Sequence, residues 1–184
     1  MAKGFAKREQ PSFSMSKIAA KLPASARWYD SVMSDPHDLQ RFVDAQEPSY
    51  AEALREIRAG RKRSHWMWYV FPQIAGLGNS QVSARYAIRS KNEARAYLAH
   101  AILGPRLIEC AEAVLALNNR SARDIFGSPD DLKLRSCATL FAQVTPPESV
   151  FERLLDKYYS SEPDPKTLSL LESISLTDQD GNDR

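Results

Sequence analysis

The residues best suited to chemistry are concentrated in one segment, residues 64–80, which reads SHWMWYVFPQIAGLGNS. Histidine titrates near neutral pH, tryptophan can stack against a flat ring, and a glutamine amide both donates and accepts hydrogen bonds. Together with polar residues on neighbouring helices, these side chains predict a pocket that binds or processes a small anionic or nucleotide-like ligand. The candidate residues are Gln46, His65, Trp66, Trp68, Gln73, Gly76, Gly78, Ser80, Lys133 and Ser136.

The glycines of this segment have two interpretations. Gly76 and Gly78 allow backbone angles that other residues avoid, and Ser80 can cap a following helix. Free amide donors beside the glycines would suit a phosphate group. Neither GxGxxG nor GxxxxGK followed by Ser or Thr is present, so a tight turn between two helices is the alternative, and the commoner one.

The histidine and the tryptophans also have a structural alternative. His65 is either a proton-transfer group in an apolar setting or a core residue that bonds a backbone carbonyl. Trp66 and Trp68 either stack on a ring of a ligand or fill the core. No HExxH pattern and no cysteine cluster accompanies the three histidines, so the sequence predicts no bound metal and points to no cofactor. A non-catalytic structural or protein-interaction domain is the alternative function.

Charge is unevenly distributed along the chain. Residues 1–29 carry six basic side chains and one acidic side chain, a net charge of +5, whereas the whole chain carries +2. The remaining residues are therefore mildly acidic, at −3, which makes nucleic acid an unlikely partner despite the basic run at 58–63. Within that region, Glu56 either pairs with Lys62 or Arg63 or faces solvent.

Composition also bears on location. No run approaches the roughly 18 apolar residues of a membrane span, and the N-terminus lacks the apolar stretch of a secretory signal. Cys110 and Cys137 lie on apolar helical stripes, which is typical of reduced core cysteines. We therefore expect a cytoplasmic protein without a membrane partner, and no pattern indicates its oligomeric state.

Helices are expected to position these residues. The Trp-rich segment is either a central strand or a helix that starts at the cap Ser64 and stops near Phe71. A helix is favoured, because helical spacing and start signals recur along the chain, for example at Ser80 and at Asp164-Pro165. We predict an all-α fold, a single compact multi-helical domain of about eight short helices over residues 35–175. A mobile basic N-terminal tail (1–34) and a polar C-terminal tail (176–184) are expected to flank it.

Several motifs together resemble one known family. They are AQ at 45–46, HWMWYVFPQ at 65–73, GLGNS at 76–80, LGPRLIE at 103–109, IFG at 125–127, DDLKLRSCATLF at 130–141 and LDKYY at 155–159. On these residues the chain resembles a bacterial family catalogued as domain of unknown function 1810, over about residues 38–171. The resemblance implies a single, mostly helical domain, with no established activity and no assigned catalytic residues. The calpastatin label sometimes given to this family does not fit, because calpastatin repeats are disordered inhibitors and this sequence is typical of a compact domain.

Overall fold

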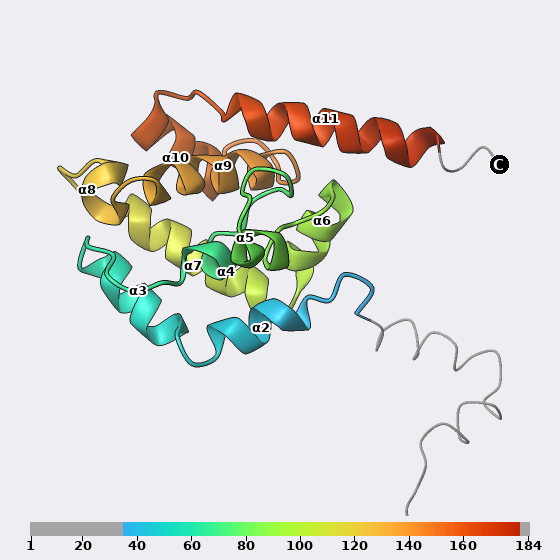
Figure 1. Cartoon of the computed structure of the whole chain (residues 1–184). Helices are drawn as coiled ribbons and strands as arrows, with labels where there is room; N and C mark the ends of the chain where they lie inside the picture. Colours follow the sequence, from blue (N-terminus) through green and yellow to red (C-terminus); the bar gives the residue numbers. More distant parts are fainter. Residues whose placement is uncertain (1–34, 181–184) are drawn as a thin grey trace, which may run out of the picture. The chain divides into compact units, whose positions relative to one another are not determined.

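The computed structural model describes the backbone of residues 35–180 and the side chains of residues 35–174. The predicted N-terminal tail and the last four residues lie outside the described residues. Within that range the chain forms ten helices and no strand, which confirms the predicted all-α fold (Figure 1). The helices are α2 (Gln40–Gln46), α3 (Tyr50–Arg58), α4 (Met67–Val70), α5 (Gln81–Arg85), α6 (Lys91–Ala99), α7 (Leu103–Leu115), α8 (Ala122–Phe126), α9 (Asp130–Ala142), α10 (Val150–Tyr159) and α11 (Pro165–Asp180).

The described residues from His37 onward form one compact unit. The last helix, α11, begins at Pro165, directly after Asp164, as the sequence predicts. The predicted end of the helical domain at residue 175 falls inside α11, which continues to Asp180.

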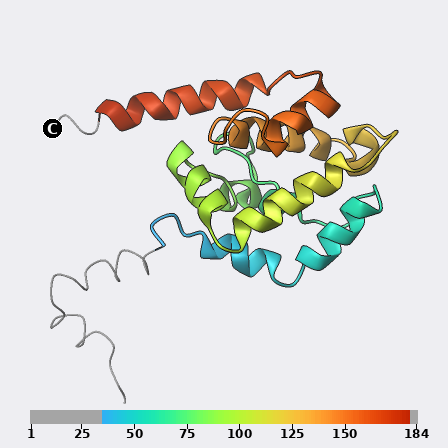
Figure 2. The same ribbon diagram turned by 180° about the vertical axis from the view of Figure 1, so that it is seen from behind.

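The centre of the fold is formed by α7 and α9. Helix α7 packs against α3, α6 and α10, whereas α9 packs against α8, α10 and α11. Figure 2 shows α7, in yellow, running between α6 and α3. The two cysteines lie on these central helices, and both Cys110 and Cys137 are buried and free, as predicted.

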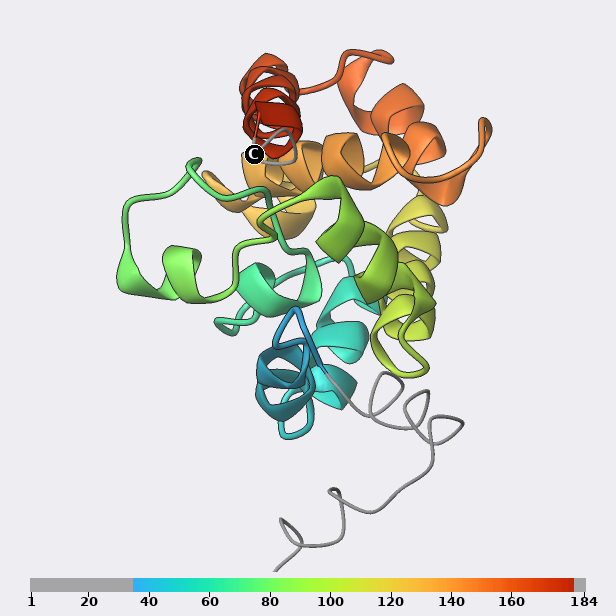
Figure 3. The same cartoon turned by 90° about the vertical axis from the view of Figure 1, so that its right-hand side faces the viewer.

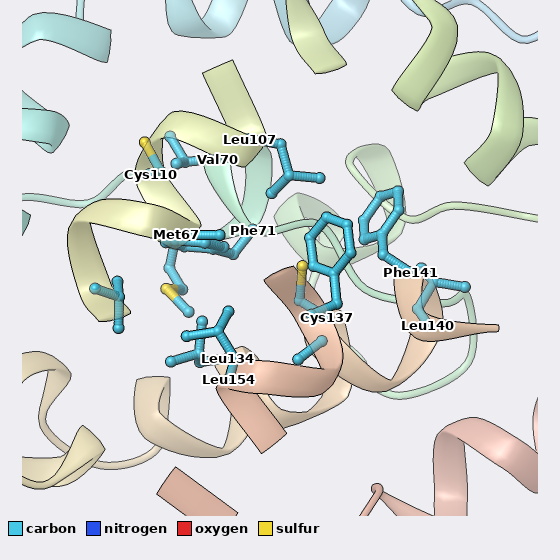
Figure 4. Close-up of a cluster of buried hydrophobic side chains, with 14 of the residues drawn as sticks. Met67, Val70, Phe71, Leu107, Cys110, Leu134, Cys137, Leu140, Phe141 and Leu154 are labelled. Carbon is cyan, nitrogen blue, oxygen red and sulfur yellow. The ribbon is translucent and has the colours of Figure 1, made fainter. Parts of the chain in front are cut away.

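The Trp-rich segment contributes apolar side chains to this core. Met67, Val70 and Phe71 are buried in the same cluster as Leu107 of α7 and Leu134 of α9 (Figure 4). Burial of a side chain of this size stabilises the fold by about 1.5–3 kcal/mol. The segment is therefore anchored in the interior by one of its faces.

The helix in this segment is shorter than predicted. It begins at Met67, so its N-cap position is Trp66 and not Ser64. The N–H and the hydroxyl of Ser64 donate to the buried carboxylate of Glu56, which holds this residue in the turn ahead of the helix. Arg63 N and Trp66 Nε1 also donate to Glu56 Oε2, each at 2.8 Å. Burial alone would raise the pKa of Glu56, but hydrogen bonds from Ser64, Arg63 and Trp66 outweigh it and lower the pKa to about 2. The expectation of an ion pair or a solvent-facing position for Glu56 is wrong, since this carboxylate holds the chain ahead of α4.

The segment after α4 forms a closed loop, residues 75–87, which we name the glycine loop (Figure 3, green). An isolated bridge between Ile74 and Ile88 joins its two ends. In this bridge Ala75 N donates to Ile88 O and Ile88 N donates to Gln73 O, both at 2.8 Å. The short helix α5 lies within the loop and is capped by Ser80, as predicted.

The return of the glycine loop is held by Arg41 of α2. This buried guanidinium donates to Arg85 O and Ala87 O, both at 2.9 Å, and to Glu93 Oε1 at 2.5 Å. Two further bonds reach carbonyls that precede α2. Removing one partner of a buried ion pair destabilises a protein by about 3–5 kcal/mol, so the loop is firmly tied to α2 and α6.

Candidate functional site

A cleft of about 520 Å³ lies between the glycine loop, α9 and the start of α11. Its volume falls within the range of roughly 300–1,000 Å³ that is usual for small-molecule sites. Six of the predicted site residues line it, namely Trp68, Gln73, Gly78, Ser80, Lys133 and Ser136. The cleft therefore brings together the Trp-rich segment and α9, which are far apart in the sequence.

A smaller space of about 150 Å³, which we name the side hollow, adjoins the cleft. Both are lined by Trp68, Gln73, Gly78 and Ser83. The predicted residue Gly76 lines the side hollow and not the cleft. The other lining residues of the side hollow are Ile74, Ala75, Ala84, Tyr86, Ala87 and Arg89.

Positively charged side chains predominate around the cleft. Lys133, Arg135 and Lys166 line it, against one carboxylate, that of Asp164. Arg135 pairs with Glu162, at 3.3 Å, in an ion pair whose carboxylate is largely exposed. Along the part of the chain that the structure describes, the Lys166 ammonium has no ion-pair partner. Among the side chains that line the cleft, positive charges therefore outnumber negative ones by three to one.

The ammonium of Lys133 is positioned by two groups. It lies 2.7 Å from Asp130 Oδ1 and 4.3 Å from the centre of the Trp68 ring. Lys62 approaches the other oxygen of Asp130, also at 2.7 Å, and the lysine side chains are only 9% and 20% exposed, Lys62 being the less exposed. Burial alone would raise the pKa of Asp130, but Lys133 and Lys62 outweigh it and lower the pKa. Two cations thus share one anion, which leaves a net positive charge beside the cleft.

Asp164 forms hydrogen bonds with side chains of α9 and α11. Its Oδ2 accepts from Ser136 Oγ at 2.8 Å and from Thr167 Oγ1 at 2.7 Å, and its N–H donates to Thr139 Oγ1 at 2.8 Å. Burial alone would raise the pKa of Asp164, but hydrogen bonds from Thr167 and Ser136 lower it below its usual range. The carboxylate therefore ties the start of α11 to α9, and the Ser136 hydroxyl serves that tie.

Gly76 and Gly78 lie in the turn that joins α4 to α5. Helix α5 has only five residues, and its Ser83 N and Ala84 N donate to the hydroxyl and the carbonyl of Ser80. A Cβ at Gly78 would lie 2.7 Å from the Ser83 side chain, so glycine permits the close approach of the two loop segments. Of the two interpretations, the turn is therefore favoured over a backbone cradle for phosphate.

Three predicted site residues lie outside both spaces. Gln46 is buried, and its Nε2 donates to Tyr69 O at 2.7 Å and to Tyr97 Oη at 3.0 Å. Trp66 is buried, and its indole N–H is used by Glu56. His65 is exposed, so both expectations for it, an apolar setting and a place in the core, are wrong. The reason is that the chain is not yet helical at His65, so its apolar neighbours in sequence turn inward without it.

The sequence-based prediction missed several residues around the cleft. Arg135 lies between the predicted residues Lys133 and Ser136 on α9, and Lys166 follows the predicted helix start at Asp164-Pro165. Proximity in the sequence to these predicted features was the only signal that could have identified either residue. No local pattern pointed to Lys62, because its partner Asp130 belongs to a distant helix.

Among residues 35–174, no group of three or more His, Cys, Asp or Glu side chains is arranged to hold a metal ion. No helix along the described part of the chain combines the length and the apolar character needed to cross a membrane.

Comparisons with known proteins find a family and a related solved structure. The family model described as "Protein of unknown function (DUF1810)" matches residues 36–171. Among solved structures, the chain is similar to the crystal structure of the conserved hypothetical protein Rv1873 from Mycobacterium tuberculosis, with 54% sequence identity and a TM-score of 0.74. That match covers 75% of this chain and 99% of the other. A comparison with curated proteins finds no match.

Proposed function

We propose that this chain, which belongs to the DUF1810 family of proteins of unknown function, binds a small anionic ligand in the cleft. One observation carries the proposal: Lys133, Arg135 and Lys166 converge on a single cleft whose one carboxylate is already engaged in hydrogen bonds. An anion entering the cleft would meet three cations, two of them also paired with Asp130 and Glu162, whereas Lys166 has no ion-pair partner among the described residues.

The hydrogen-bonding capacity of the lysines supports this proposal. An ammonium group has three donors, and the Lys133 ammonium uses one of them on Asp130. Asp130 and the Trp68 ring hold this ammonium at the cleft, so little side-chain entropy is lost when an anion binds it. A hydrogen bond to a charged group contributes about 1.5–3 kcal/mol. Two or three such bonds are enough for binding in the millimolar to micromolar range.

The proposal is tested by thermal shift and calorimetry on the full chain with inorganic phosphate and pyrophosphate at low ionic strength. A ligand at 100 times its Kd stabilises the folded state by about 2.7 kcal/mol, or roughly 5–10 °C in Tm for a domain of this size. Replacing both Lys133 and Lys166 by glutamine is expected to weaken binding at least tenfold. Arg95→Gln removes one positive charge from an exposed site on α6 that lines neither space, and it serves as the control.

Two results would contradict the proposal. One is the absence of any Tm shift with either anion, which would favour the alternative of a non-catalytic structural or protein-interaction domain. The other is an equal loss of affinity in Arg95→Gln and in the double variant, which would indicate attraction by overall charge and not by the cleft.

A further inference from the structure

We infer that the ligand carries a single six-membered ring in addition to its anionic group, and that the ring occupies the side hollow. This inference rests on the proposed function, because it extends the anion site to a neighbouring space. The chemical class is a phosphate ester of a single-ring heterocycle, for which a pyrimidine nucleotide is the natural probe.

The two adjoining spaces differ in character. The cleft is bordered by three cations, whereas the side hollow has one, Arg89, and its other walls are mainly aromatic and aliphatic, from Trp68, Ile74, Tyr86 and three alanines. A ligand that is charged at one end and flat and weakly polar at the other would match this division. A bare anion would leave the apolar walls of the side hollow in contact with water.

The size of the side hollow indicates the size of the group. Its volume is about 150 Å³. An apolar protein cavity of about 150 Å³ accommodates one benzene molecule. The hollow therefore fits a single six-membered ring and is small for a fused two-ring base.

Four residues line both spaces and form the boundary along which the ligand would lie. From the glycine loop it is formed by Gly78 and Ser83, which are small, and from the other side by Trp68 and Gln73. The Gln73 amide makes one long hydrogen bond, from Nε2 to Lys133 O at 3.5 Å. An amide with such a weak partner is available to bond a ring nitrogen or carbonyl, which a heterocycle offers and a benzene ring does not.

The experiment is calorimetry on the full chain with inorganic phosphate, ribose 5-phosphate and uridine 5′-monophosphate. We expect the uridine nucleotide to bind at least tenfold more tightly than ribose 5-phosphate. Ala84, which is exposed and lines the side hollow, is changed to leucine to fill the space. Ala84→Leu should remove the advantage of the nucleotide and leave phosphate affinity within about twofold. Ala51→Leu, at an exposed position on α3 away from both spaces, should change neither value.

The outcomes separate the two proposals. Equal affinities for the nucleotide and for ribose 5-phosphate in the wild-type chain would overturn the ring inference and leave the anion site standing. Binding of none of the three compounds would overturn both. Retention of the nucleotide advantage in Ala84→Leu would place the ring elsewhere. As a measurement that needs no variant, the alanine methyl signals of Ala84 and Ala87 in NMR spectra should shift with the nucleotide and not with phosphate. Unchanged methyl signals at saturation would also overturn the inference.

Discussion

The indole nitrogen of Trp66 donates to Glu56 Oε2 at 2.8 Å, and this bond joins α3 to the start of the Trp-rich segment. Because the same carboxylate also accepts from the backbone of residues 63 and 64, it determines where α4 begins. Both Trp66 and Trp68 were predicted either to stack on a ligand or to fill the core. Trp66 is a buried structural donor, and Trp68 lines the cleft.

Glu56→Gln is expected to lower the free energy of unfolding at pH 7 by about 2–4 kcal/mol, because a neutral amide cannot accept from all four donors. Urea unfolding measures the effect. Glu52→Gln, on the same helix at an exposed carboxylate, is the control and should change stability by less than about 0.5 kcal/mol.

The effect of Glu56 should depend on pH. Its folded-state pKa is lowered to about 2, from an ordinary value of 4.5, so its contribution is present above pH 4.5 and is lost as the pH falls towards 2. The stability difference between the wild type and Glu56→Gln should therefore shrink over that interval. A difference that stays constant from pH 7 to pH 2 would show that the charge of Glu56 is not what stabilises the turn.

Gln46 and Gln73 were both predicted to line the ligand pocket. In the structure Gln46 is buried in the core, whereas Gln73 lines the cleft. Gln46→Leu should lower the free energy of unfolding by about 1–3 kcal/mol, since Tyr69 O and Tyr97 Oη lose a buried donor. It should leave phosphate affinity unchanged. Gln73→Leu should change stability by less than about 0.5 kcal/mol and weaken nucleotide binding. Urea unfolding and calorimetry on both variants distinguish the roles, and the reverse pattern would assign Gln46 to the ligand.

Gly104→Ala should destabilise the fold by about 3 kcal/mol or more, which is large for the addition of one methyl group. A Cβ at this position would lie 2.0 Å from Leu98 O, a backbone atom that cannot move without separating α6 from α7. Gly127→Ala is the matched comparison, because a Cβ there meets nothing within 4 Å and only its φ of +72° is unfavourable. We expect a cost of about 1–2 kcal/mol for Gly127→Ala. Equal midpoints for the two variants in urea would rule out a tight α6–α7 contact.

Local signals were enough to predict much of the fold. The cap at Ser80 and the Asp164-Pro165 start both open helices, because these signals act within a few residues. The same reasoning failed at Ser64, because Glu56 of α3 holds residues 63–66 in a turn and the helix begins only at Met67. A capping residue acts only where the helix begins, and that point was set here by a carboxylate from a distant helix, which the sequence does not show.

The candidate site shows the same limit. Trp68, Gln73 and Lys133 were identified by residue type, and the structure brings them to one cleft. The bridge from Lys62 through Asp130 to Lys133 could not be predicted, because it depends on the packing of α8 and α9 beside the end of α3. His65 shows the converse error, in which apolar neighbours in sequence suggested an enclosed position for an exposed side chain.

Arg41 connects the first described helix to the far end of the glycine loop through carbonyl acceptors on both. The glycine loop, which forms one wall of the cleft, therefore cannot move on ligand binding without changing these bonds to Arg41. A structural change at the beginning of α2 that moves the Arg41 guanidinium would also move the glycine loop, which lines the cleft. The affinity for a ligand would then change through Arg41, a residue that does not line the cleft.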